Sequence, residues 1–141
     1  MTSPFLYQHN SRYFAQVAGE SEAVAAVELE ALGMLEVSVA HRGVWFSGDF
    51  SQLMRANYSC RSLSRIIAPL MSFNAHKEQF LYRRALELPW EELLSEGDTI
   101  AVFANVANSN VRNSHYASLL IKDAICDRMK EVTGARPDVD R

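Results

Sequence analysis

Residues 35–50 read L-E-V-S-V-A-H-R-G-V-W-F-S-G-D-F, two strand-like runs joined by a short turn. The runs 35–40 and 44–47 are rich in β-branched and aromatic residues, which favours strands. Between them, His41-Arg42-Gly43 can form a hairpin turn in which the glycine supplies a positive backbone angle. This stretch therefore predicts an antiparallel hairpin near the middle of the first half of the chain.

The hairpin is flanked on each side by a helix and a further strand. Asp49 can cap a helix at 50–59, because its carboxylate accepts hydrogen bonds from the free N–H groups of the first turn. A strand at 13–18 and a helix at 22–32 precede the hairpin, and a strand at 65–73 follows. The order strand, helix, two strands, helix, strand is typical of the ferredoxin-like fold, in which helices cover one face of an antiparallel sheet.

The second half of the chain has a different pattern. Helices are expected at 77–88 and 114–132, the second capped by Ser114, with one strand at 99–105 between them. Because only one clear strand follows residue 75, we expect this lobe to continue beyond the end of the chain. The sequence as a whole predicts an α+β protein of two small packed lobes.

Composition excludes several classes of protein. Apolar residues make up 48% of the 141 residues and charged residues 22%, which is ordinary globular composition. The net charge of −3 gives no general basic field, so a nucleic-acid partner requires a local cationic patch. The two cysteines lack metal-type spacing, which argues against a metal site and favours a reducing, cytoplasmic setting. No signal peptide or long apolar run is present, so no membrane partner is expected.

No motif for catalysis or cofactor binding is found in the sequence. There is no G-x-G-x-x-G, no P-loop and no nucleophile elbow, and the six glycines are scattered singly. We therefore assign no catalytic, metal-binding or cofactor-binding residue to this chain.

One polar stretch is a candidate binding site. Residues 105–116 read N-V-A-N-S-N-V-R-N-S-H-Y and lead into the last long helix, whose N-terminus presents free N–H groups that favour a phosphate. Asn and Ser are also ordinary turn formers, which explains most of the stretch without any ligand. Turn formation does not require the cationic side chains of Arg112 and Lys122, however. The candidate contact residues are Asn108, Asn110, Arg112, Asn113 and Ser114 before or at the helix start, and His115, Ser118 and Lys122 on one helical face.

Four segments resemble the N-terminal part of the bacterial 23S ribosomal RNA guanine-N2 methyltransferases: RGVWFSGD (42–49), RANYSCRSLSRIIAPL (55–70), LPWEELL (88–94) and NSNVRNSHYASLLIKDAICDRMKEVTGARPDVDR (108–141). These enzymes join a ferredoxin-like segment and a THUMP domain to a Rossmann-type methyltransferase domain. The resemblance implies that residues 1–53 form the ferredoxin-like segment and residues 54–141 a THUMP domain, incomplete at its C-terminus.

The resemblance also implies a function. THUMP domains of this family bind structured RNA, here 23S ribosomal RNA, and hold it for the catalytic domain, with Arg112 and Lys122 as the expected contacts. The family's S-adenosylmethionine loop and Asn/Asp-Pro-Pro-Tyr/Phe tetrapeptide have no counterpart in this chain. The cofactor is therefore expected in a downstream methyltransferase domain. Two alternatives stay open: the THUMP module of a transfer RNA-modifying enzyme, and a non-enzymatic protein-interaction module, which the negative net charge favours.

Overall fold

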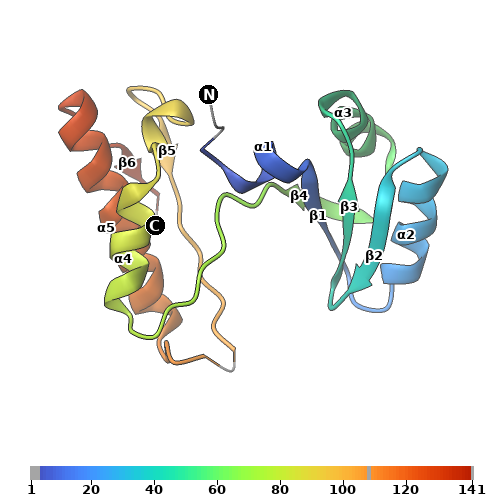
Figure 1. Cartoon of the computed structure of the whole chain (residues 1–141), viewed down its shortest axis with the longest axis horizontal. Helices are drawn as coiled ribbons and strands as arrows, with labels where there is room; N and C mark the ends of the chain where they lie inside the picture. The colour runs from blue at the N-terminus through green and yellow to red at the C-terminus, as the bar shows by residue number, and fades with distance from the viewer. Residues whose placement is uncertain (1–3, 108, 141) are drawn as a thin grey trace. The chain divides into compact units, whose positions relative to one another are not determined.

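The computed structural model describes residues 4–107 and 109–140 and divides between Ser72 and Phe73 into two compact units. The first unit contains α1 (Leu6–Asn10), β1 (Arg12–Val17), α2 (Glu22–Ala31), β2 (Leu35–Ala40), β3 (Gly43–Ser47), α3 (Phe50–Ser59) and β4 (Leu63–Ile67) (Figure 1). The second contains α4 (Gln79–Glu87), the 3-10 helix η1 (Trp90–Glu92), β5 (Thr99–Ile100), α5 (Ser114–Thr133) and β6 (Asp138–Val139). Among the described residues, no helix has the length and apolar character needed to cross a membrane.

The first unit has the predicted ferredoxin-like fold. Its sheet has the order β2-β3-β1-β4, and every neighbouring pair is antiparallel. Successive residues of β1 alternate between partly buried and buried, as expected for a strand with one face in a core. The core combines Ala15 and Phe46 of the sheet with Leu29 of α2 and Ala56 of α3, all of them at most 1% exposed. The predicted hairpin and the order of the elements in this unit are confirmed.

The turn of the hairpin differs from the prediction in one respect. The positive backbone angle belongs to Arg42, with φ of 55°, and not to Gly43. Gly43 begins β3 and is needed for space, because a Cβ atom there would lie 2.0 Å from Cζ of Phe14. The predicted cap of α3 is confirmed: Asp49 Oδ1 accepts from the Gln52 N–H at 2.8 Å, and Gln52 Oε1 accepts from the Asp49 N–H at 2.9 Å.

The first unit also extends further along the chain than expected. The expected division between residues 53 and 54 falls inside α3, whereas the compact unit continues to Ser72. The physical reason is that Ala56 of α3 belongs to the core and β4 is hydrogen-bonded to β1. The strand expected at 65–73 forms instead as β4 at Leu63–Ile67, where β1 offers partners. Beyond it, the carbonyls of Pro69 and Leu70 accept from the first N–H groups of α1, a helix that was not predicted.

The second unit is built around a helix pair. α5 packs against α4 and η1, and its inward face buries Ala117, Ala124, Ile125, Cys126 and Met129. Gly134 ends α5 in the left-handed conformation, with φ of 81°. The strand expected at 99–105 forms only at β5, Thr99–Ile100, which pairs in parallel with β6. The predicted strand was too long, because its partner β6 pairs with only two residues of that run. β6 itself was not predicted.

Candidate nucleic-acid interface

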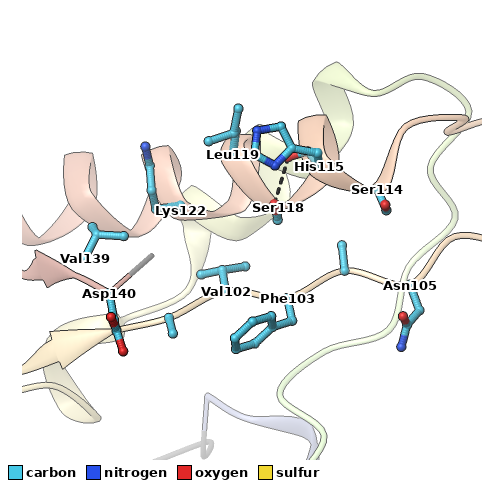
Figure 2. A pocket seen from close by; sticks show the side chains of 12 residues that line it. Val102, Phe103, Asn105, Ser114, His115, Ser118, Leu119, Lys122, Val139 and Asp140 are labelled. Carbon is cyan, nitrogen blue, oxygen red and sulfur yellow. Dashed lines mark hydrogen bonds between the residues drawn. The ribbon is translucent and has the colours of Figure 1, made fainter.

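A groove of about 880 Å³ lies in the second unit between residues 101–105 and the N-terminal half of α5 (Figure 2). Residues 101–105 are extended beside the helix, with side chains alternating between exposed and half-buried. Phe103 is 90% exposed, whereas Val102 is half-buried. The C-terminal edge of the groove is formed by Val139 and Asp140, at and just after β6. The groove is therefore open, partly apolar, and bordered by a long helix.

Four of the predicted contact residues line this groove: Ser114, His115, Ser118 and Lys122. They meet there because residues three and four apart share a face of α5. Lys122 is 26% exposed at its side chain and its Nζ atom lies 2.9 Å from Oδ1 of Asp123, so part of its charge is already balanced. The Ser118 hydroxyl donates to the backbone carbonyl of His115 at 2.7 Å, as Figure 2 shows. Ser118 can thus offer a ligand only an acceptor in this conformation.

The loop before α5 carries the other predicted residues. Asn113, not Ser114, caps the helix: its backbone is extended and its side-chain oxygen accepts from the Tyr116 N–H at 3.1 Å. The predicted capping role of Ser114 was wrong by one residue, because the helix already begins at Ser114. The Ser109 hydroxyl accepts from the Val111 N–H at 3.1 Å, and Val111 is buried, which anchors the loop. The side chains of Ser109 and Asn113 therefore stabilise the backbone conformation of the loop and of the helix start.

Asn110 and Arg112 are exposed on this loop and do not line the groove. No ion pair between described residues involves Arg112, so its guanidinium is available to an anion. It precedes the N-terminus of α5 by two residues, where helix N–H groups also favour negative charge. Asn108 lies outside the described residues.

No contact residue was predicted among residues 101–105, which contribute Phe103 and Asn105 to the groove. They belong to a run that was interpreted as an ordinary strand, and nothing in the local pattern indicates that it would border a groove. The available signals were the aromatic residue within the run and Asn105, which begins the polar stretch 105–116. An exposed aromatic ring can stack on a nucleobase, and Asn105 supplies donors and an acceptor.

These groups are suited to binding an anion. Lys122 and Arg112 can neutralise phosphates, and His115 can donate or accept a hydrogen bond. Within residues 4–107 and 109–140, no group of three His, Cys, Asp or Glu side chains is placed to hold a metal ion. The carboxylate of Asp140 opposes anion binding at one edge of the groove. An extended, negatively charged partner contacting the Arg112 loop and the Lys122 face fits this arrangement best.

Both units match described protein families. Residues 12–67 match the RlmL ferredoxin-like domain, and residues 75–141 match the THUMP domain. The chain therefore contains an RlmL ferredoxin-like domain followed by a THUMP domain. The groove and the Arg112 loop both lie in its THUMP domain.

Relatives of this chain are named as ribosomal RNA methyltransferases. It is 36% identical over 129 residues to the ribosomal RNA large subunit methyltransferase K/L of Syntrophotalea carbinolica, covering 92% of this chain. It is 37% identical over 131 residues to the protein of the same name from Photobacterium profundum, covering 93% of this chain. In both cases the chain spans 18% of the relative's length.

Solved structures share the fold of the THUMP chain. The crystal structure of SMU.472 complexed with SAH matches with a TM-score of 0.78 at 24% identity, covering 98% of this chain and 36% of that one. The crystal structure of a predicted N6-adenine-specific DNA methylase from Listeria monocytogenes matches with a TM-score of 0.74 at 27% identity, covering 86% of this chain and 32% of that one. The fold described above is thus also found within longer proteins.

Proposed function

We propose that this chain is the RNA-binding part of an S-adenosylmethionine-dependent 23S ribosomal RNA guanine-N2 methyltransferase, acting in the cytoplasm. Its THUMP domain holds structured RNA through the Arg112 loop and the Lys122 face of α5. Phosphate contacts of this kind set position and register and carry little sequence information. Holding the RNA also removes translational freedom before the methyl transfer, which is assigned to a domain outside this chain.

The observation that carries the proposal is the grouping of Lys122, His115 and Ser118 on one groove wall, in a chain whose relatives are named ribosomal RNA methyltransferases. The exposed Arg112 lies just before the same helix.

The test is the salt dependence of RNA binding by the double variant Arg112→Ala with Lys122→Ala. Each phosphate neutralised contributes about −0.7 to the slope of log affinity against log salt on single strands. Loss of two contacts should therefore flatten the slope by about 1.4 and weaken binding at low salt. Filter binding or fluorescence anisotropy with fragments of 23S ribosomal RNA gives this slope.

Lys130→Ala is the matched control, because Lys130 is exposed on the same helix and does not line the groove. It should change the slope by much less than the double variant. An unchanged slope in the double variant would overturn the proposed interface. Tighter binding of transfer RNA than of 23S fragments at equal salt would instead overturn the ribosomal target, in favour of a transfer RNA-modifying enzyme.

A further inference from the structure

The sheet of the first unit has a second face that α2 and α3 do not cover. α2 and α3 pack on the face that contains Ala15 and Phe46. Because side chains alternate along a strand, Phe14 of β1 and Trp45 of β3 point to the opposite face. They are direct cross-strand partners on the two central strands. Two aromatic rings therefore lie side by side at the middle of the second face.

The aromatic pair extends into a row across all four strands. Trp45 is paired with Ser38 of β2, and Phe14 is paired with Ile67 of β4. The Phe14 and Trp45 ring centroids are 4.9 Å apart with an interplanar angle of 59°, and both side chains are half-buried. The Phe14 ring also lies over Gly43, where a Cβ atom would be 2.0 Å from Cζ. The absence of a side chain at residue 43 thus leaves room for the ring against the sheet.

Two arginines flank this row on the same face. Arg12 precedes Phe14 by two residues and its guanidinium carbon lies 5.9 Å from the Trp45 ring centroid. Arg65 of β4 is the cross-strand partner of Gln16, two residues after Phe14, and is exposed. Arg12 contacts Glu36 at 3.3 Å, but Glu36 is 73% exposed, and such a surface pair is weak enough to yield to a phosphate.

Aromatic residues at the centre of a four-stranded antiparallel sheet, with cations beside them, are the arrangement that stacks unpaired bases in RNA-recognition sheets. Base stacking on aromatic rings tolerates any sequence, and neighbouring arginines attract the backbone. We propose that the Phe14–Trp45 face binds unpaired nucleotides of single-stranded RNA. This site lies in the first unit and is separate from the THUMP groove, so it does not require the interface proposed above.

The test uses the full chain and a single-stranded oligoadenylate. Trp45 and Trp90 are the two tryptophans, so Trp90→Phe leaves Trp45 as the sole tryptophan, which is excited selectively at about 295 nm, where tyrosine hardly absorbs. Stacking should quench Trp45 with the single strand and not with a duplex of the same length. Phe14→Leu and Trp45→Leu should each weaken binding of the single strand by about 5- to 150-fold, the range that corresponds to the loss of one stacked base.

Phe50→Leu is the matched control, because Phe50 is 73% exposed on α3, the helix that covers the other face. It should bind like the parent chain. Arg65→Ala provides a second test without loss of packing and should flatten the salt slope by about 0.7. Circular dichroism verifies that each variant is folded.

Parent-like affinity of folded Phe14→Leu and Trp45→Leu, or an equal loss in Phe50→Leu, would overturn the inference. A dimer of the parent chain that Trp45→Leu dissociates, seen by sedimentation, would overturn it in favour of a protein interface. Arg112→Ala with Lys122→Ala should leave the Trp45 quenching unchanged. Failure of this inference and failure of the proposed function are therefore measured in different variants.

Discussion

The two units use similar strand sequences with different results. In the first unit, Phe46 is 0% exposed, because β3 lies between β1 and β2 and two helices cover its inner face. In the second, Phe103 is 90% exposed, although its run T-I-A-V-F-A-N is as apolar as β3. A phenylalanine of an apolar run is thus part of the core in the first unit, whereas in the second unit it borders a groove.

Each unit contains one tryptophan, so the contrast can be measured directly. Trp45 reports on the first unit and Trp90 on the second, where its Nε1 donates to the Ala85 carbonyl at 2.7 Å. Single-tryptophan variants, Trp90→Phe and Trp45→Phe, allow denaturant unfolding of each unit to be followed by fluorescence.

The largest expected effect separates the two phenylalanines. Phe46→Ala should lower the unfolding free energy of the first unit by about 3–5 kcal/mol, because it removes a fully buried ring and leaves a cavity. Phe103→Ala should change the stability of the second unit by no more than about 0.5 kcal/mol, because its ring is in solvent. Urea unfolding followed at Trp45 and Trp90 measures the two values. A similar loss in both variants would contradict the contrast between the units.

A smaller effect is expected on the face of the first sheet that carries Phe14 and Trp45. Gly43→Ala should cost about 1–3 kcal/mol, because the new methyl group overlaps the Phe14 ring and forces it to move. Phe14→Ala should lose its own packing but abolish that cost. A double-mutant cycle therefore gives a coupling energy between residues 14 and 43, and a coupling of zero would show that the ring does not limit residue 43.

The smallest effect concerns the ion pair that joins α5 to η1 in the second unit. Arg128 Nε donates to Glu91 Oε2 at 3.0 Å, and this hydrogen bond lowers the pKa of Glu91 below its usual 4.5. A carboxyl with a lowered pKa in the folded state stabilises the fold above its usual pKa, and the contribution is lost as the pH falls through the lowered value. Glu91→Gln should cost about 1 kcal/mol at pH 7 and progressively less below about pH 4.5.

Glu92→Gln is the control for this pair, because Glu92 is adjacent, exposed and unpaired among the described ion pairs. Its stability should follow that of the parent chain at every pH. Equal pH profiles for Glu91→Gln and the parent would show that the pair contributes nothing to the second unit.

Local signals predicted the first unit well. The hairpin, the Asp49 cap and the helices at 22–32 and 50–59 depend on residues close in sequence, so their patterns carried the information.

The Asn113 cap was missed because two adjacent residues can both cap a helix, and the choice depends on the backbone angles at 113. The division near residue 72 was missed because it depends on the pairing of β4 with β1.

The candidate site was predicted in part. Helical spacing alone placed His115, Ser118 and Lys122 on one face, and all three line the groove. The opposite wall, with Phe103, could not be predicted, because it brings together segments separated by a loop. Arg112 and Asn110 remain candidates on an exposed loop that the groove does not include.

Sequence by itself determined the helices α2 to α5, the β2–β3 hairpin and the polar face of α5, because these follow from side-chain periodicity and from caps a few residues away. Tertiary structure decided which apolar runs became strands, since a strand exists only where another strand satisfies its backbone groups. Pairing also decided that Phe14 and Trp45 meet across β1 and β3 and that Gly43 makes room for the ring. Such contacts join residues far apart in the chain, and no local pattern encodes them.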